Sequence, residues 1–269
     1  MKVPVLTAKL NKPQLPDNMI LRTGLLKDSN RASVILVSAQ VGSGKSTIVS
    51  AWLSEQNTSY FWYALDEWDN DLQQFFAYLI AGVNSLDRKP SAQLEQMLEA
   101  FQSIGLEGFL KGFVQSLHTI DHPFIMVFDD YQTIQNKLIH QVLKTIIEHM
   151  PKWMQLVLIT REDPPLPLAK LRANKRLLEV RISDLKFTED EVRTFFLQQL
   201  NLTLQDEQLQ LVYKRTEGWI AGLQLAALSM RGLDDKSGFI EAFTDSHNYI
   251  MDYLIEEVLE NQTLELNYP

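Results

Sequence analysis

SAQVGSGKST, residues 38–47, joins an apolar run to a segment with helical periodicity. The run before it, SVILVS (33–38), is rich in β-branched residues, which is typical of a parallel strand covered on both faces. Gly42 and Gly44 allow the backbone to turn tightly with its N–H groups pointing inward, and we expect a helix to begin near Ser46. The amides of such a turn and the positive end of that helix form a cradle for an anion.

This stretch matches the phosphate-loop pattern G-x-x-x-x-G-K-[ST], except that Ala39 stands in place of the first glycine. Its position between a predicted strand and a predicted helix supports the match. Lys45 is expected to reach the β and γ phosphates of a nucleotide, and the Ser46 hydroxyl to ligate Mg²⁺. The residues predicted to bind the nucleotide are Gln40, Val41, Gly42, Ser43, Gly44, Lys45, Ser46 and Thr47. The alternative is a glycine-rich turn with a surface lysine.

The run FIMVFDD (124–130) ends in Asp129 and Asp130. At the carboxyl end of a parallel strand, Asp129 would lie beside the phosphate loop and hold Mg²⁺ through water. Asp130 occupies the place where many ATPases keep an acid that orients the attacking water. The alternative is that two acids end a strand and cap a turn.

A third strand end carries Thr160 and Arg161, in the stretch LVLITR. Because the carboxyl ends of parallel strands face the ligand crevice, Arg161 is expected to contact the γ-phosphate through charge-assisted hydrogen bonds. A solvated arginine at a strand end is the alternative.

Four further apolar runs are spaced widely enough for helices to lie between them: YFWYAL (60–65), PFIMVFD (123–129), MQLVLIT (154–160) and LLEVRI (177–182). Two of the intervening segments place apolar residues on one helical face, namely Phe75, Phe76, Leu79, Ile80 and Val83, and Val142, Leu143, Ile146 and Ile147. Strands that alternate with helices predict an α/β fold with a parallel five-stranded sheet between helices. The irregular helical stretch 86–118 is expected to be an insertion.

Only helical patterns follow the last predicted strand. Thr188 and Glu191 form a capping box at the start of the first of these helices. Further helices are expected at about 205–216, 219–231 and 237–260, the last with Met251, Leu254, Ile255, Val258 and Leu259 on one face. We therefore predict an N-terminal segment at 1–30, an α/β domain at 31–185, a helical domain at 186–260 and a tail at 261–269.

Composition narrows the class of protein. The chain has 269 residues, 45% of them hydrophobic, which is enough to bury a large core. Its net charge of −9 offers no general attraction to nucleic acid. The absence of cysteine excludes disulfides and thiolate metal sites. Since no signal peptide and no run long enough to cross a bilayer are visible, a soluble protein in the cytoplasm is the simplest expectation.

Several stretches together resemble one known family: LTAKLNKP, ILRTGLL, SAQVGSGKST, WYALDEWDND, FAYLIAGV, VFDDYQTI, LITREDPPLPLAKLRA, LLEVRISDLKFTEDEV, TEGWIAGLQLAALSMRG and DYLIEEVLE. The chain looks like the N-terminal nucleotide-binding module of the STAND class of signalling ATPases, in the large LuxR-type transcription activators of the MalT kind. The order and spacing of the stretches agree from about residue 5 to residue 260.

The resemblance implies a P-loop NTPase sheet with strand order 2-3-4-1-5, followed by a small helical domain. It implies an adenine site formed by Ile20, Leu21 and Arg22. It also implies a nucleotide contact from a Gly-x-Pro motif, which here reads Gly222, Leu223 and Gln224, so that glutamine replaces the proline.

Members of this class are switches. They rest with ADP bound, an inducer and ATP favour a form that self-associates, and slow hydrolysis of ATP resets them. The family's winged-helix domain, sensor repeats and DNA reader have no counterpart before Pro269. The resemblance therefore implies a fragment of a longer regulator or a naturally short form, without direct contact to nucleic acid or membrane.

Two other classes of function remain open. A small-molecule or nucleotide kinase would also use a phosphate loop and Mg²⁺, but it usually carries an arginine-bearing lid, and the 86–118 stretch contains only Arg88, Lys89 and Lys111. A nucleotide-insensitive interaction scaffold is the second alternative.

Three remaining features favour ordinary structural roles. His118 and His122 are four residues apart, yet Pro123 breaks the helix and no third ligand is near, so we expect a solvated loop rather than a metal site. Trp219 is expected to pack in the protein rather than on a nucleotide. The acidic residues Asp66, Glu67, Asp69 and Asp71 are expected to form a solvated turn.

Overall fold

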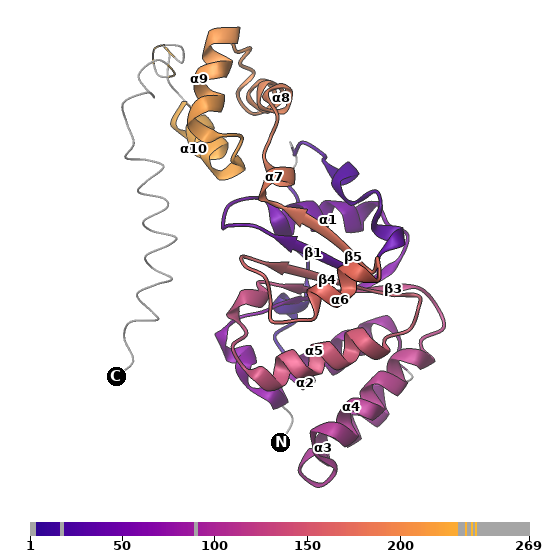
Figure 1. Ribbon diagram of the computed structural model, residues 1–269. Coiled ribbons are helices and arrows are strands. Elements are labelled where there is room, and N and C mark those ends of the chain that lie inside the picture. The colour runs from indigo at the N-terminus through magenta and orange to yellow at the C-terminus, as the bar shows by residue number, and fades with distance from the viewer. Residues whose placement is uncertain are drawn as a thin grey trace. The chain divides into compact units, whose positions relative to one another are not determined.

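The computed structural model describes residues 4–16, 19–88 and 91–230, together with Asp235, Gly238 and Ile240 (Figure 1). The helix predicted at 237–260, with its apolar face from Met251 to Leu259, and the tail at 261–269 lie outside the described residues. The chain divides into two compact units. The first comprises Met1–Leu15, Leu21–Val41 and Lys45–Asp184, and the second comprises Pro16–Ile20, Gly42–Gly44 and Leu185–Pro269.

A five-stranded sheet forms the centre of the first unit. Its strands are β1 (Val34–Ser38), β2 (Ser59–Ala64), β3 (Phe124–Asp129), β4 (Met154–Thr160) and β5 (Leu177–Arg181). All pairings are parallel, and the order β2-β3-β4-β1-β5 confirms the predicted topology. Because β4 lies between β1 and β3, Thr160 pairs in register with Ser38, and the ends of these three strands are neighbours.

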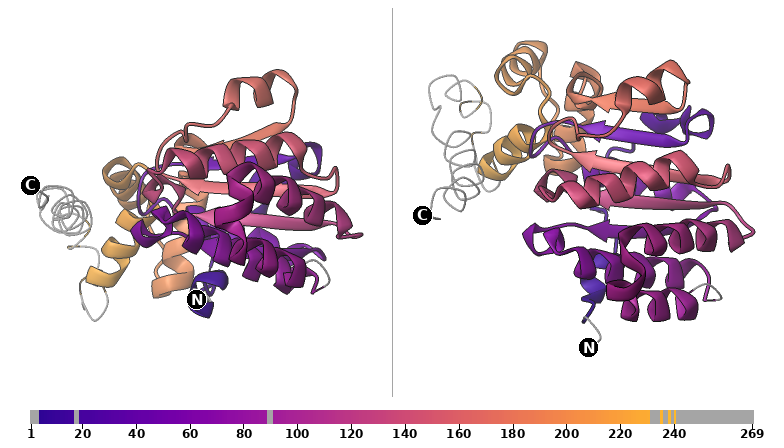
Figure 2. Two further views of the ribbon diagram at one scale, coloured as in Figure 1. Left: turned by 90° about the horizontal axis from the view of Figure 1, so that it is seen from below. Right: turned by 60° about the horizontal axis from the view of Figure 1, so that its bottom comes forward.

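The strands are apolar because both faces of the sheet are covered. Every residue of β1 and of β3 is buried. One face packs in a common core with apolar residues of α2 (Leu72–Leu86), α4 (Phe101–Thr119) and α5 (Lys137–His149), and Figure 2 shows these helices layered against the sheet. The apolar faces predicted around Phe75 and around Val142 are confirmed, since their members are buried.

The remaining helices of this unit are α1 (Lys45–Glu55), α3 (Ser91–Glu99) and α6 (Leu168–Ala173), and α7 (Ile182–Leu185) ends at the first residue of the second unit. The predicted insertion after α2 is the pair α3 and α4, and α4 is kinked at Gly105, whose φ is +66°. In the described part of the chain, no helix combines the length and the apolar character needed to cross a bilayer.

The second unit contains three helices among its described residues: α8 (Glu189–Leu200), α9 (Asp206–Thr216) and α10 (Ile220–Met230). The predicted capping box is confirmed, because the Glu191 amide donates to the Thr188 hydroxyl and the Thr188 amide to the Glu191 carboxylate. Residues of all three helices share one core, against which Ile20 packs.

The expectation of a solvated acidic turn after β2 is wrong for Asp69. This residue is fully buried, and its carboxylate accepts hydrogen bonds from the Tyr63 hydroxyl at 2.7 Å and from Gln74 Nε2 at 3.2 Å. The Asp66 amide also donates to it, at 2.8 Å, which closes a capping box. A buried carboxylate needs such partners because it has lost its water.

Lys9 supplies the cation for this carboxylate. Its ammonium pairs with Asp69 and lies 2.9 Å from an oxygen of Asp66 and 5.0 Å from the ring centroid of Tyr78. Burial alone lowers the pKa of Lys9, but the hydrogen bonds to Asp69 and Asp66 outweigh it, and the pKa is raised. The N-terminal segment is therefore held to β2 and α2 by a largely buried ion pair.

Replacing Lys9 by Met leaves the buried Asp69 without its cation, so we expect the free energy of unfolding to fall by about 3 kcal/mol. Urea unfolding at neutral pH measures this change. The matched control is Lys111→Met, which removes an exposed pair with Glu107 and is expected to leave the free energy of unfolding almost unchanged. Equal losses in the two variants would contradict the assignment.

Candidate functional site

The turn after β1 has the backbone that the sequence predicted. Gly42 and Gly44 have φ values of +68° and +81°, in the region that favours glycine. Within the second unit, the Gly42 carbonyl accepts a hydrogen bond from the Ala221 amide at 3.2 Å. A Cβ added at Gly42 would lie 2.8 Å from that of Ala221 and 2.9 Å from the Trp219 ring. Both backbone conformation and space therefore require glycine at this position.

Lys45 is the first residue of α1, and its side chain is buried despite its charge. Its ammonium donates to the Gln40 carbonyl at 2.9 Å. Burial lowers the pKa of Lys45, and the positive charge of Arg161 acts in the same direction, against Asp130 and Asp129. The two acids come from the end of β3, and Arg161 comes from the end of β4. The first unit therefore gathers the charged residues predicted for the site around one ammonium group.

Ser46 and Asp129 form the second part of the site. The Ser46 hydroxyl donates to Asp129 Oδ1 at 2.8 Å, and Asp129 is only 5% exposed. Burial and the neighbouring Asp130 raise the pKa of Asp129 to about 6, against the opposing effects of the Ser46 hydroxyl and Lys45. The carboxylate is thus poorly compensated within the protein.

This donor set fits Mg²⁺. A serine hydroxyl and a carboxylate are hard oxygen ligands, and Mg²⁺ is usually bound by one or two protein oxygens together with waters and phosphates. Among the described residues there is no group of three or more histidine, aspartate or glutamate side chains that could hold a metal ion. Ser46 and Asp129 are thus the two residues that could hold a magnesium ion here.

Asp130 follows β3 with φ +55° and ψ 41°, a left-handed conformation. Its half-buried carboxylate accepts a hydrogen bond from Gln132 Nε2 at 2.8 Å. Arg161 is exposed directly after β4, and its backbone amide donates to Gln132 Oε1 at 3.1 Å. The sequence did not single out Gln132, although it stands two residues after the acidic pair that was recognised.

The residues implied by resemblance fall in both units. Ile20 and Gln224 belong to the second unit, where Gln224 is exposed on α10. Leu21, which is 64% exposed, and Arg22 belong to the first unit, where Arg22 donates to the Asp184 carbonyl at 3.1 Å. Their roles toward a nucleotide stay predictions.

The expectation of a solvated loop is wrong for His118. This residue lies in the last turn of α4, and its Nε2 is 2.8 Å from the His149 carbonyl oxygen. Its ring meets that of Trp153 edge to face. His118 therefore connects α4 to the end of α5.

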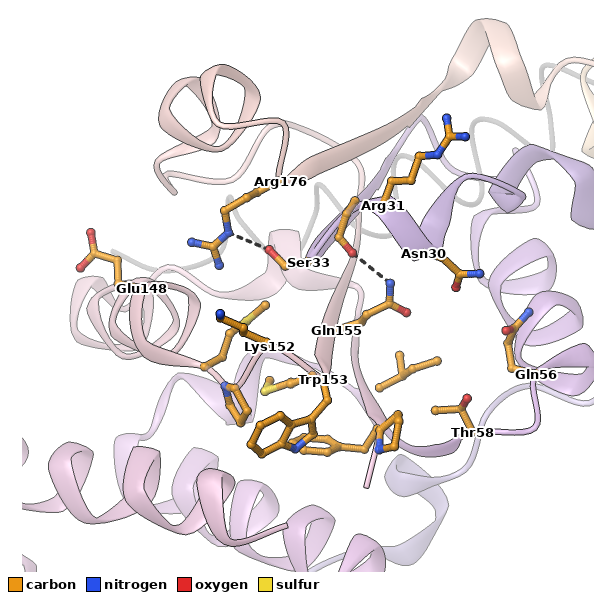
Figure 3. A pocket seen from close by; sticks show the side chains of 17 residues that line it. Asn30, Arg31, Ser33, Gln56, Thr58, Glu148, Lys152, Trp153, Gln155 and Arg176 are labelled. Atoms are coloured by element: carbon orange, nitrogen blue, oxygen red, sulfur yellow. Dashed lines mark hydrogen bonds between the residues drawn. The ribbon is translucent and has the colours of Figure 1, made fainter. Parts of the chain in front are cut away.

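A pocket of about 580 Å³ lies at the other edge of the sheet, where β1, β3, β4 and β5 begin (Figure 3). Arg176 lines it and donates to the Ser33 hydroxyl at 2.9 Å and to the Ile147 carbonyl, in the last turn of α5, at 3.0 Å. Gln155 donates to the Ala32 carbonyl at 2.9 Å. The guanidinium is thus used to cap a helix, and the pocket contains none of the residues predicted to bind a nucleotide.

Comparison with known proteins identifies two similar transcriptional regulators. It is 31% identical to the HTH-type transcriptional regulator MalT of Cronobacter sakazakii and 30% identical to that of Klebsiella pneumoniae, each over 264 residues and 96% of this chain. The chain spans 29% of the length of these relatives. No family model matches it.

A solved structure is similar over most of the chain. It is the crystal structure of a Signal Transduction ATPase with Numerous Domains (STAND) protein with a tetratricopeptide repeat sensor, from Pyrococcus horikoshii. The TM-score is 0.61 at 16% identity, and the match covers 90% of this chain and 34% of that one. The two proteins share a fold, in which the five-stranded parallel sheet is followed by helices.

Changing Asp129 to Asn keeps an acceptor for Ser46 but removes a buried charge. A carboxylate whose pKa rises from 3.8 to about 6 on folding destabilises the fold above the folded pKa, and this cost disappears as the pH falls toward the unfolded pKa. Without nucleotide or Mg²⁺, we expect Asp129→Asn to raise the free energy of unfolding by about 3 kcal/mol at pH 8, and much less at pH 4, in urea unfolding.

Glu179→Gln is the control of opposite sign. The pKa of Glu179 is held at about 2, chiefly by its hydrogen bond to Arg172, so removing this charge should destabilise the protein at pH 8. If both variants are destabilised alike at pH 8, the account of Asp129 is wrong.

Proposed function

Because the chain is homologous to the MalT regulators over 96% of its length, we propose that it is the nucleotide-controlled switch module of such a transcriptional regulator. In this proposal it binds ADP or ATP with Mg²⁺ and hydrolyses ATP slowly. The observation that carries the proposal is the group of the buried Lys45 and Asp129 and the half-buried Ser46. The ends of β3 and β4 also bring Asp130 and Arg161 close to Lys45.

Each residue has a role that its chemistry supports. Lys45 and the backbone amides of residues 42–47 hold the phosphates, and Ser46 and Asp129 hold Mg²⁺, which when bound offsets the negative charge of the phosphates. Asp130 orients the attacking water, and Arg161 contacts the γ-phosphate. Hydrolysis then forms a bond from water oxygen to the γ-phosphorus and breaks the bond to the bridging oxygen, releasing ADP and phosphate.

The remaining predicted contacts complete the nucleotide site in this proposal. Ile20, Leu21 and Arg22 contact the adenine, and Gln224 stands where related modules carry a proline that touches the nucleotide. The state of the γ-phosphate controls the helical unit, and the ATP-bound form self-associates. Inducer sensing and DNA binding would belong to other parts of the larger regulator.

Lys45→Ala tests whether the site binds a nucleotide. Loss of a charged hydrogen-bond partner for the phosphates should weaken ADP and ATP binding by roughly 10- to 100-fold in titration calorimetry. Saturating Mg-ADP should raise the melting temperature of the unsubstituted chain and leave that of the variant almost unchanged.

The control is Lys170→Ala, which removes an exposed lysine paired with Glu148 and should leave binding intact. Equal affinity in Lys45→Ala and the unsubstituted chain would support the scaffold alternative instead. Phosphate found on a metabolite, rather than free in water, would support the kinase alternative.

Hydrogen exchange tests the switch. If the γ-phosphate controls the helical unit, exchange protection of residues 188–230 should differ between three samples: without nucleotide, with Mg-ADP, and with a non-hydrolysable ATP analogue. Identical protection in all three samples, at concentrations where calorimetry shows binding, would rule out this coupling while leaving nucleotide binding intact.

A further inference from the structure

The backbone at Asp130 is unusual for a residue with a side chain. A left-handed conformation costs an ordinary L-residue roughly 1 kcal/mol or more, although aspartate tolerates it better than most. Such a conformation persists only where the surroundings hold it. Here the Asp130 carbonyl accepts from the Thr133 amide at 3.1 Å and from the Thr133 hydroxyl at 2.9 Å. The chain is therefore turned sharply just after β3 and fixed in that turn.

The turn that follows, Tyr131–Thr133, is itself anchored to the core. Tyr131 is 1% exposed, and its hydroxyl lies 2.7 Å from Nδ1 of His140 on α5. Gln132 is thus attached to a rigid backbone, and its side chain needs little ordering to reach its partners.

Both polar atoms of the Gln132 side-chain amide form hydrogen bonds. Its nitrogen donates to the Asp130 carboxylate at 2.8 Å, and its oxygen accepts from the Arg161 backbone amide at 3.1 Å. Asp130 leaves β3, and Arg161 leaves β4, which is the neighbouring strand. One side chain therefore connects the two strand ends that carry the acid and the arginine of the site.

We propose that Gln132 is a positioning residue that fixes the Asp130 carboxylate relative to the backbone of Arg161, so that the two groups act on the γ-phosphate from one rigid frame. The proposal rests on the proposed ATP hydrolysis. It adds a residue that contacts neither phosphate nor metal ion in the proposed mechanism. Gln132 acts by orienting the Asp130 carboxylate.

The chemistry of the side chain explains why an amide is suited to this place. Glutamine offers a donor to a carboxylate and an acceptor to a peptide N–H at the same time. An ionised glutamate keeps the acceptor, but it loses the donor and sets a second negative charge beside Asp130. Methionine has a similar length and can make neither hydrogen bond well.

Single-turnover hydrolysis of ATP and titration calorimetry with ADP test the proposal on the 269-residue chain. Misaiming a group by about 1 Å can cost roughly 100-fold in rate, so we expect Gln132→Met and Gln132→Glu to lower the hydrolysis rate constant by about 10- to 100-fold. ADP affinity should stay within about twofold, since Lys45, Ser46 and Asp129 are unchanged.

Gln155→Met is the matched control. Gln155 also donates its amide to two carbonyl groups, those of Ser29 and Ala32, but it lies at the opposite edge of the sheet. The free energy of unfolding of this variant should fall, while its hydrolysis rate constant should stay unchanged. If Gln132→Met does not fold, Gln132→Glu decides, because it keeps the bond to the Arg161 amide.

The outcomes separate the positioning role from other causes. A hydrolysis rate within twofold of the unsubstituted chain in both Gln132 variants overturns the proposal, as does a parallel loss of ADP affinity, which indicates a merely structural role. An unsubstituted chain that binds no nucleotide or hydrolyses no ATP overturns the proposed hydrolysis itself, and the role of Gln132 with it.

Discussion

The hydrogen bond from Ser46 to Asp129 joins the first turn of α1 to the end of β3, where the Asp129 carboxylate is almost fully buried. A carboxylate in such a place is costly unless a cation is near, and the raised pKa of Asp129 expresses that cost. Lys45 is the nearby cation, but it compensates the Asp129 charge only in part, because burial also lowers the pKa of Lys45. The first unit thus keeps opposite charges close together without fully neutralising them. Such an arrangement suits a site that binds a charged ligand.

The sheet makes this arrangement possible. Strands buried on both faces leave no freedom to slip in register, because a shift by one residue would exchange the two packed faces. The order in which β4 separates β1 from β3 then fixes which strand ends are neighbours. Polar residues at those ends, from Ser38 to Thr160, share one edge although more than a hundred positions separate them in the chain. The apolar runs therefore determine the geometry of the charged groups.

Sequence patterns were sufficient for the strands, their order and the glycine-rich turn, because each depends on local periodicity or on a family resemblance. They failed where the partner is distant. Asp69 belongs to an acidic stretch that looks solvated, but it is buried, and the cation that pairs with it, Lys9, lies 60 residues away in the chain. Gln132 carries no recognisable signal in the sequence, because its role in the fold depends on the position of Arg161, 29 residues later. Charge and polarity along a chain do not reveal which groups become neighbours.

Native mass spectrometry of the 269-residue chain can decide whether the site binds a magnesium nucleotide, because it counts bound nucleotide and metal on intact molecules. When Mg-ADP is added, we expect a species that carries one adenine nucleotide and one Mg²⁺ per chain, and retention of ADP through purification would agree with this expectation. A folded chain that keeps its bare mass at millimolar Mg-ADP would contradict it.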